Sequence, residues 1–169
     1  MNTFRLRSGI EVTIRPIGPD DGPRLQCAYN RLSPESKYRR FLAAKPHLTS
    51  ADTRYLVQVD GRDHVALVAT PTHDPTRFVG VGRFVRQNED PELAELAIVV
   101  ADEFQEEGLG TELVARLART ATDVGVRRFR GTMLAENRAA HRLVRRAAAG
   151  ATRERPKGYI HEIEIELAA

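Results

Sequence analysis

Alternating hydrophobic and polar positions along the chain predict a series of short strands. In the last of them Ile163 and Ile165 alternate with glutamates, which is the two-residue period of a strand with one buried face. A continuous apolar run over 93–101 instead predicts a central strand covered on both faces. The predicted strands are 11–16, 64–70, 78–86, 93–101, 128–134 and 159–167.

Apolar residues at helical spacing predict helices between these strands. Leu109, Leu113 and Leu117 fall on one face of a helix over 108–125, which Gly125 ends. The other predicted helices are 19–32, a short one from Pro34, one with Thr49 and Asp52 at capping-box spacing that ends near Gln58, and 138–149, capped by Asn137 and ended by Gly150.

The order of these elements sets the expected fold class. Helices and strands are interleaved, so the class is α/β or α+β with a mixed sheet. The 169 residues contain no repeat, linker or low-complexity segment, and a chain of this length can bury a core of its own. We therefore expect one domain over 1–169.

Composition and charge exclude several classes of protein. Lys plus Arg is 26 against 23 for Asp plus Glu, and the net charge of +3 is too small for a nucleic-acid-binding surface. We expect the short basic clusters at 37–40, 127–130 and 145–146 to be solvated. No apolar run is long enough to cross a bilayer, and the segment from Met1 does not resemble a secretion signal.

Cysteine and histidine usage bears on compartment and on metal binding. Cys27 is the only cysteine, which favours the reducing cytoplasm. Its position on an amphipathic helix predicts a small buried residue. The five histidines show none of the spacings of a metal-binding motif, so no metal site is predicted.

The segment Gln105-Glu106-Glu107-Gly108-Leu109-Gly110 lies between the predicted central strand and the long helix. A glycine-containing turn that enters a helix leaves backbone N–H groups unpaired beside the positive end of the helix dipole, and so forms a cradle for an anion. The segment has neither the GxxxxGK[ST] pattern nor GxGxxG. An ordinary helix start is the alternative interpretation.

These residues resemble the signature of the GNAT superfamily of acyl-CoA-dependent N-acetyltransferases, Q/R-x-x-G-x-G/A after a central strand. Residues 94–100 look like the fourth strand of that fold, and 133–150 look like its fifth strand, asparagine and following helix. Residues 14–17 and 31–41 are similar to the acetyltransferase domain of bacterial Pat-type protein lysine acetyltransferases. The resemblance implies a mixed, mostly antiparallel sheet of six to seven strands, with helices on both faces and a split between the fourth and fifth strands.

The resemblance also implies a place for acetyl-CoA as co-substrate. Its pantetheine arm is expected along the fourth strand, on backbone groups of Ile98, Val99 and Val100, with Asn137 approaching from the fifth strand. Its pyrophosphate is expected on backbone N–H groups of the glycine-containing loop. The loop residues of this assignment are Gln105, Glu106, Glu107, Gly108, Leu109, Gly110 and Thr111.

A carboxylate is expected to assist the chemistry. An amine must lose its proton before it attacks a thioester, and a free lysine has a pKa of about 10.4. Glu95 matches the strand position where the family often has its general base, and Glu92 is the substitute candidate. If Glu95 faced outward from its strand, it would be an ordinary surface residue.

Two features depart from the family pattern. Glu106 and Glu107 stand where the family often has a basic residue, so their charge is expected to weaken CoA binding. Val144 stands where many members carry a tyrosine that could protonate the departing thiolate. His141 and Tyr159 are nearby candidates for the acid, and water is a further one.

The predicted function is transfer of an acetyl group to a primary amine by direct attack. A protein lysine is the first choice of acceptor, and small amines and protein N-termini are alternatives. Contacts with the acceptor are expected from 33–47 and 153–158, because these loops flank the acyl end of the cleft. A noncatalytic acyl-CoA-binding sensor is the second hypothesis, favoured by the two departures described above.

The oligomeric state is left open between a monomer and a homodimer. Glu162, Glu164 and Glu166 alternate along the last predicted strand. Such a strand is either a solvated edge of the sheet or a surface that pairs with a second subunit.

Overall fold

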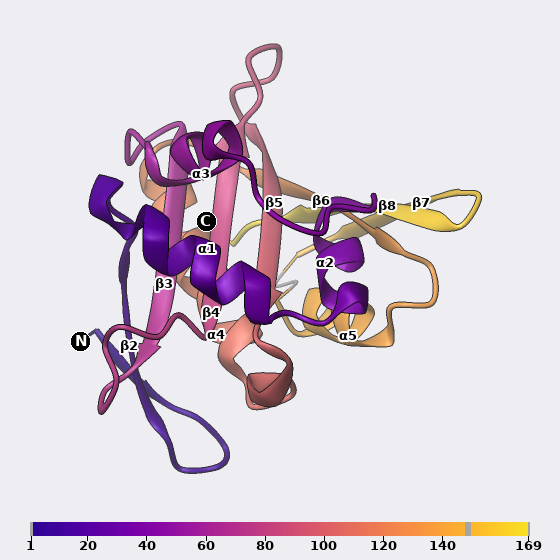
Figure 1. Cartoon of the computed structure of the whole chain (residues 1–169). Helices are drawn as coiled ribbons and strands as arrows, with labels where there is room; N and C mark the ends of the chain where they lie inside the picture. Colours follow the sequence, from indigo (N-terminus) through magenta and orange to yellow (C-terminus); the bar gives the residue numbers. More distant parts are fainter. Residues whose placement is uncertain (1, 148–149, 169) are drawn as a thin grey trace.

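The structure is a computed structural model that describes residues 2–147 and 150–168, with an eight-stranded sheet at its centre (Figure 1). The strands are β1 Thr3–Arg5, β2 Glu11–Pro16, β3 His64–Pro71, β4 Gly80–Arg86, β5 Leu93–Val100, β6 Arg128–Leu134, β7 Thr152–Lys157 and β8 Ile160–Glu166. The helices are α1 Gly22–Arg31, α2 Pro34–Phe41, α3 Ser50–Val57, α4 Leu109–Asp123 and α5 Arg138–Ala147, with 3-10 turns at Pro19–Asp21 and Asp102–Phe104.

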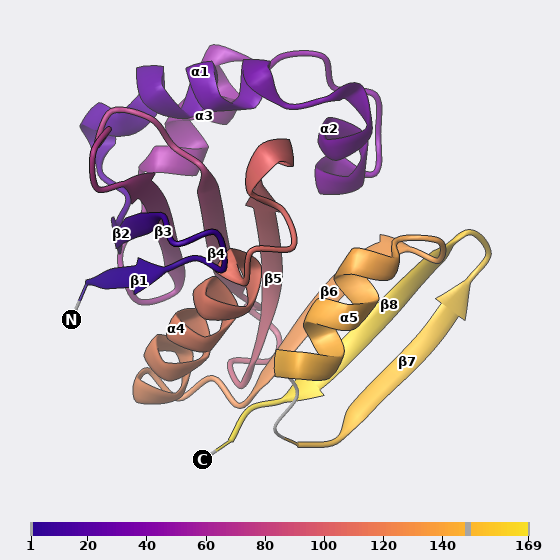
Figure 2. The same cartoon turned by 90° about the horizontal axis from the view of Figure 1, so that it is seen from below.

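The sheet divides between β5 and β6. The strand order is β1-β2-β3-β4-β5-β6-β8-β7, and every neighbouring pair is antiparallel except β5 with β6. These two strands pair only over 93–95 and 128–130. Beyond that point they diverge, and Figure 2 shows β6, β8, β7 and α5 as a wing separated from the rest of the sheet. The mixed sheet and its predicted split are confirmed, whereas the expected number of six to seven strands is wrong, because the short β1 and the exposed β7 bring the sheet to eight.

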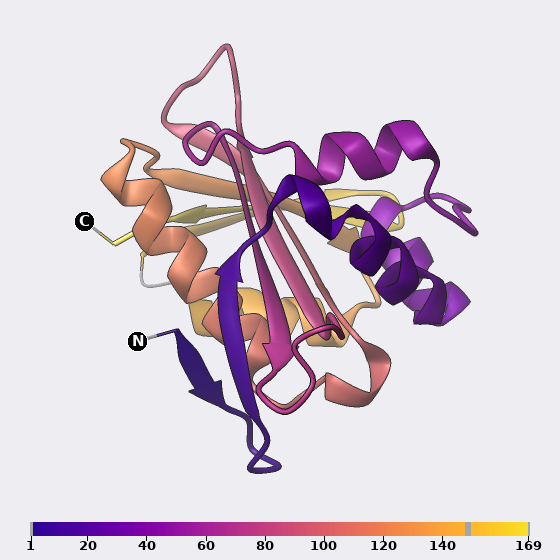
Figure 3. The same cartoon turned by 60° about the vertical axis from the view of Figure 1, so that its left-hand side comes forward.

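Helix α4 covers one face of the larger part of the sheet, as Figure 3 shows. Its predicted apolar face is confirmed, since Leu109, Leu113 and Leu117 are buried against β4. The close approach explains a glycine in β4: a Cβ on Gly82 would lie 2.9 Å from Leu117 Cδ1 and 2.8 Å from Ile98 Cδ1. The two layers can pack at this distance only because the strand has no side chain there.

Helices α1 and α3 cover the opposite face, so helices lie on both faces as predicted (Figure 3). The capping box that begins α3 is also confirmed. Thr49 Oγ1 accepts a hydrogen bond from the Asp52 backbone N–H at 3.1 Å, and Asp52 Oδ2 accepts one from the Thr49 N–H at 2.8 Å. These two bonds satisfy donors that the first turn of a helix leaves free.

The wing has a small core of its own. Met133, Ile163 and Ile165 are buried there, and Ala140 and Val144 of α5 pack against them. Helix α5 is capped as predicted: the Asn137 Oδ1 atom accepts a hydrogen bond from the Ala140 N–H at 3.1 Å. The predicted end of this helix at 148–149 lies outside the described residues.

Several expectations about the surface need correction. The last predicted strand, β8, is not an edge, because it lies between β6 and β7. Two of its three glutamates are paired across the sheet: Glu164 Oε1 lies 2.9 Å from Arg128 Nη1, and Glu162 Oε2 lies 2.9 Å from Lys157 Nζ. Cys27 is exposed rather than buried. Over the described residues, no helix combines the length and the apolar composition that a membrane span requires.

Candidate active site

A cleft of about 550 Å³ opens where β5 and β6 diverge. Helix α2 lines it on one side, α5 and β6 line it on the other, and the first turn of α4 forms one end. The divergence explains why Leu96, Ile98 and Val100 are only partly buried in a strand that was predicted to be covered on both faces. Within the described part of the chain, the edge of β5 that faces the cleft therefore has no partner strand beyond residue 95.

The register of β5 decides which backbone groups face the cleft. The Ala101 N–H donates to Val79 O, and the Gln87 N–H donates to Leu93 O, each at 2.9 Å. In an antiparallel pair of strands, residues whose backbone N–H and C=O groups both bond to the partner strand alternate with residues whose groups point away from it. The odd-numbered residues of β5 are therefore the ones that bond to β4. The N–H and C=O groups of residues 96, 98 and 100 are turned toward β6 and the cleft.

This alternation revises one expected contact. The backbone of Val99 belongs to the ladder with β4, opposite Val81, so it cannot also bond a ligand in the cleft. Ile98 and Val100 do turn backbone groups toward the cleft, and so does Leu96. Val99 still lines the cleft through its side chain.

The loop before α4 has the conformation of an anion cradle. Glu106 has a φ of 64° and Gly108 a φ of 91°, and this left-handed backbone turns the chain sharply into α4. The Glu112 N–H makes the first intrahelical bond, to Gly108 O at 3.1 Å. The N–H groups of Leu109, Gly110 and Thr111 are thus free of intrahelical acceptors, at the positive end of a 15-residue helix.

The two glutamates of this loop do not fill the cradle. The Glu107 carboxylate turns away to the β1–β2 turn, where Oε2 accepts a hydrogen bond from the Ser8 N–H at 2.7 Å. Glu106 is exposed and forms an ion pair with Arg142 of α5. Glu107 and Leu109 are the two predicted contacts whose side chains are absent from the cleft lining, since Leu109 is buried beneath the loop.

Glu95 lies at the point where the sheet divides. It is the last residue of the parallel pairing with β6, and its exposed side chain lines the cleft. Its partner in that pairing, Arg130, directs its Nη2 atom to Glu164 Oε2 at 3.3 Å. The substitute candidate Glu92 precedes β5 and does not line the cleft. Of the two candidate carboxylates, the structure therefore places only that of Glu95 in the cleft.

Helix α2 is attached to the loop through the buried hydroxyl group of Ser36. Ser36 Oγ donates to Asp102 Oδ1 at 2.7 Å and accepts a hydrogen bond from Gln105 Nε2 at 3.2 Å. Gln105 Nε2 also donates to Val100 O at 3.2 Å. Burial works to raise the pKa of Asp102, but the hydrogen bonds from Ser36 and Ser33 outweigh burial and hold this pKa below its ordinary value.

Arginines dominate the charge of the cleft, a feature that the sequence interpretation missed. Among the residues that the structure describes, only two acidic side chains line it, Glu95 and Glu106. The prediction of solvated basic clusters is wrong for most of their arginines, because these side chains line the cleft or pair with the glutamates of β8. The lining arginines are Arg7, Arg39, Arg40, Arg130, Arg142 and Arg146.

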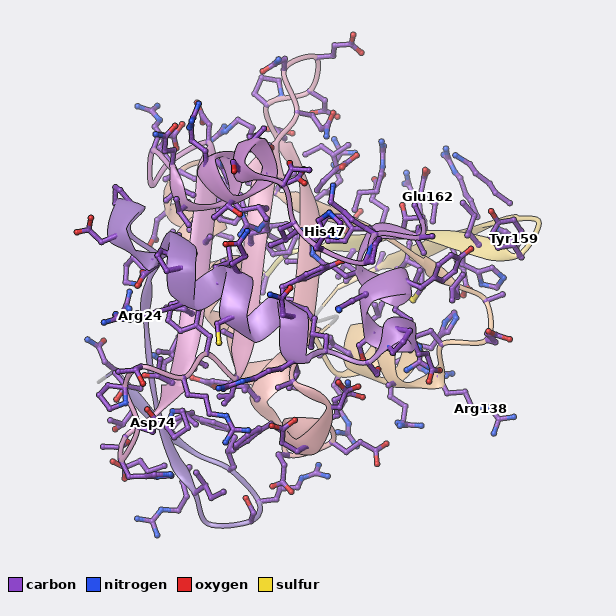
Figure 4. The ribbon with its side chains drawn as sticks, in the orientation of Figure 1. Arg24, His47, Asp74, Arg138, Tyr159 and Glu162 are labelled. Carbon is purple, nitrogen blue, oxygen red and sulfur yellow. The ribbon has the colours of Figure 1, made fainter. Side chains whose placement is uncertain are left out.

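The acid candidates and one acceptor segment lie outside the cleft. Val144 lines it at the position of the family's tyrosine, whereas His141 does not, and Tyr159 lies at the tip of the β7–β8 hairpin (Figure 4). The segment 153–158, predicted to contact the acceptor, is mostly β7 and contributes no lining residue. Helix α2, from the other predicted segment, supplies several of them.

A partly buried histidine beside a buried arginine near α3 predicts a pH effect on stability. The Arg83 Nη1 atom donates to Leu56 O at 3.1 Å and lies 3.0 Å from His64 Nε2. Burial, together with the charge of Arg83, lowers the pKa of His64. The unfolded state therefore takes up this proton first, so stability is fully present above about pH 6.5 and is lost as the pH falls toward the folded pKa.

We expect His64→Gln to flatten that loss of stability. The measurement is the free energy of unfolding in urea, taken at several pH values between about 7 and 5. His73→Gln, on the exposed β3–β4 connection, is the matched control and should keep the wild-type slope. Equal slopes for His64→Gln and wild type would contradict the assignment.

A split sheet with a free strand edge, an anion cradle and a carboxylate at the split define a CoA-dependent acyltransferase site. A family described as the acetyltransferase (GNAT) domain matches residues 11–149. The chain belongs to this family of acetyl-CoA-dependent N-acetyltransferases.

Three similar proteins extend the comparison. Acetyltransferase Pat of Mycolicibacterium smegmatis is 32% identical over 162 residues, which is 95% of this chain and 48% of Pat, so the chain spans about half of that relative. The GNAT domain of S. lividans PAT has a TM-score of 0.88 at 29% identity, covering 98% of this chain and 96% of that domain. At 16% identity, yncA of Salmonella typhimurium, solved with acetyl-CoA, shares the fold, with a TM-score of 0.71 and coverages of 93% and 94%.

Proposed function

We propose that this chain transfers the acetyl group of acetyl-CoA to a primary amine, and that the amine is a lysine side chain of a protein. One observation carries the proposal. The free edge of β5 runs from the cradle at the start of α4 to Glu95, at the point where β6 pairs with β5. A phosphate group at one end and a reacting acyl group at the other would fit this linear arrangement.

The residues present fit the co-substrate. The N–H groups at the start of α4 suit a pyrophosphate, and the lining arginines suit the remaining phosphate charge. The N–H and C=O groups of Leu96 and Ile98, together with the N–H group of Val100, suit the amides of a pantetheine arm, which would add to the sheet as a strand does. Asn137 lines the cleft and uses Oδ1 to cap α5, which leaves its Nδ2 group as the donor for the arm. The co-substrate itself supplies an activated acetyl thioester.

The chain's own residues assist the transfer at two places. Glu95 takes the proton of the acceptor ammonium, directly or through water, so that the neutral amine attacks the carbonyl carbon. As the new C–N bond forms and the C–S bond breaks, negative charge develops on the carbonyl oxygen, and N–H groups on the free edge of β5 stabilise it. Because Val144 cannot donate a proton, the leaving thiolate takes its proton from water.

The acceptor is inferred from the charge of the cleft and from similarity to Pat. Arg39 and Arg40 of α2, with Arg130 and Arg146 of the wing, line the same cleft as Glu95 and make its charge positive. A polyamine acceptor would be repelled by these arginines, whereas a lysine flanked by acidic residues would be attracted. Pat-type relatives are named as acetyltransferases, and the chain matches their GNAT domain over nearly its whole length.

The test is thiol release from acetyl-CoA with matched acceptors. One lysine peptide carries flanking glutamates, a second carries flanking arginines, and spermidine represents polyamines. We expect acceptor-dependent release, with kcat/KM at least about tenfold higher for the acidic peptide than for the basic one. Each repulsive contact between a peptide arginine and a cleft arginine costs about 1 kcal/mol, and the acidic peptide makes none of them. Fastest turnover of spermidine would overturn the acceptor assignment, and no release with any acceptor would overturn the transfer itself.

A further inference from the structure

We propose that His141, Glu154 and His161 form a binding site for a zinc ion on the wing, outside the cleft described above. One ligand atom from each residue can be chosen so that all of these atoms lie within 4.8 Å of one another. The residues come from α5, β7 and β8, three elements that meet only in the folded chain. None of the three lines the cleft.

The donor atoms already converge on one point. His161 Nδ1 contacts Glu154 Oε1 in a hydrogen bond, and His141 Nδ1 lies 3.9 Å from the same oxygen. The two imidazole rings are 5.4 Å apart between centroids, edge to face. In a tetrahedral zinc site with bonds of about 2.0–2.1 Å, the ligand atoms lie about 3.3 Å apart. Side-chain shifts of about an ångström would produce this spacing.

The tautomer of His141 is set for metal binding. Its Nε2 atom lies 3.1 Å from the carbonyl oxygen of Ala135, so Nε2 carries the proton and donates it. The lone pair is then on Nδ1, the atom that points to Glu154 and His161. Metal-bound histidines commonly donate their second ring nitrogen to a backbone carbonyl in this way. The hydrogen bond therefore orients the ring before any ion binds.

The degree of exposure suits an exchangeable ion. The side chains of His141 and His161 are 15% and 21% exposed, and that of Glu154 is 44% exposed. Two imidazoles and one carboxylate are three of the four ligands that zinc takes, and water can supply the fourth. The same donor set excludes calcium and magnesium, which prefer oxygen ligands only.

The position of the site predicts its effect. The wing's buried apolar core consists of Met133, Ile163 and Ile165. An ion held by α5, β7 and β8 would cross-link the layers around this small core, and binding free energy at such a site adds to folding stability. We therefore infer that zinc stabilises the wing, which forms one wall of the cleft, and leaves the transfer chemistry to other residues.

The experiment is a titration of the metal-free full chain with Zn²⁺ by calorimetry, with Co²⁺ absorption to report the ligand geometry. We expect one equivalent to bind and the melting temperature to rise with zinc concentration. Glu154→Gln and His161→Gln should each weaken binding at least tenfold. His73→Gln, on the exposed β3–β4 connection, should bind as the wild type does.

Two results would overturn the proposal. The first is the absence of saturable one-to-one zinc binding by the wild-type chain. The three side chains would then be together only because His161 and Glu154 share a hydrogen bond. The second is undiminished binding in Glu154→Gln, a change at an exposed side chain that the fold tolerates. Circular dichroism of each metal-free variant distinguishes a lost ligand from a lost fold.

Discussion

Replacement of Glu95 by Gln should lower kcat for acetyl transfer about 100-fold near neutral pH, since a general base typically contributes 10²–10⁴-fold. The side chain of Gln is almost the same size, so the split of the sheet at this residue should be preserved. The amide, however, cannot accept the proton of the incoming ammonium. Because a free lysine becomes neutral as the pH approaches about 10.4, the deficit should narrow steadily toward high pH.

The measurement is kcat and KM for a lysine peptide across pH, with acetyl-CoA saturating. Glu92→Gln is the matched control, because it removes the same charge just before β5 and outside the cleft. It should retain the wild-type kcat at every pH. A Glu95→Gln deficit that is the same at pH 7 and at pH 10 would point to lost positioning rather than lost proton transfer.

The sequence predicted the fold where periodicity and packing agree. The bounds predicted for β2 and β6 match those of the structure, because each strand has a buried face that its apolar residues mark. Strand β7 was missed because every one of its residues is exposed. Its sequence therefore lacks the alternation of apolar and polar residues that marks a strand with a buried face. Strand β1 was missed because only three residues pair with β2.

The parts of the site that lie in one continuous segment of the chain could be predicted from the sequence. The parts that depend on contacts between distant segments could not. The loop before α4 and the carboxylate of β5 lie within one continuous segment, so their order alone suggested the cleft. The ion pair of Arg142 with Glu106 joins α5 to that loop, and no local pattern marks it. The same holds for Ser36, whose contact with Asp102 attaches α2 to the cleft.

The glutamates of the loop before α4 show most directly that an electrostatic effect cannot be predicted from the charge of a residue alone. Their charges alone suggested weak CoA binding. The fold turns Glu107 toward the Ser8 N–H and pairs Glu106 with Arg142, so neither carboxylate occupies the cradle. The sign of an electrostatic effect depends on side-chain direction, and that is fixed here by segments far away in the sequence.

A carboxylate introduced inside the cradle should weaken the binding of acetyl-CoA. Glu106 and Glu107 are not expected to do so, because their carboxylates lie outside the cradle. Gly110 is the second residue of α4, and a Cβ there would lie 3.6 Å from the Leu143 methyl groups and 3.9 Å from Val100 Cγ2. These are ordinary contacts, so Gly110→Asp fits, with its side chain directed into the gap between β5 and α5. An acidic residue in the first helical turn is also favourable to the helix by about 0.3–1 kcal/mol.

We therefore expect Gly110→Asp to raise the Kd for acetyl-CoA about 100-fold while leaving the melting temperature unchanged or higher. Two like charges about 5 Å apart at an effective dielectric constant near 20 repel by about 3 kcal/mol, which corresponds to that factor. Calorimetric titration measures the Kd. Ala115→Asp adds the same charge to an exposed position of α4 and should bind as the wild type does. Unchanged affinity in Gly110→Asp would show that the phosphate binds elsewhere than at the start of α4. Loss of affinity in both variants would reflect only the overall charge of the helix.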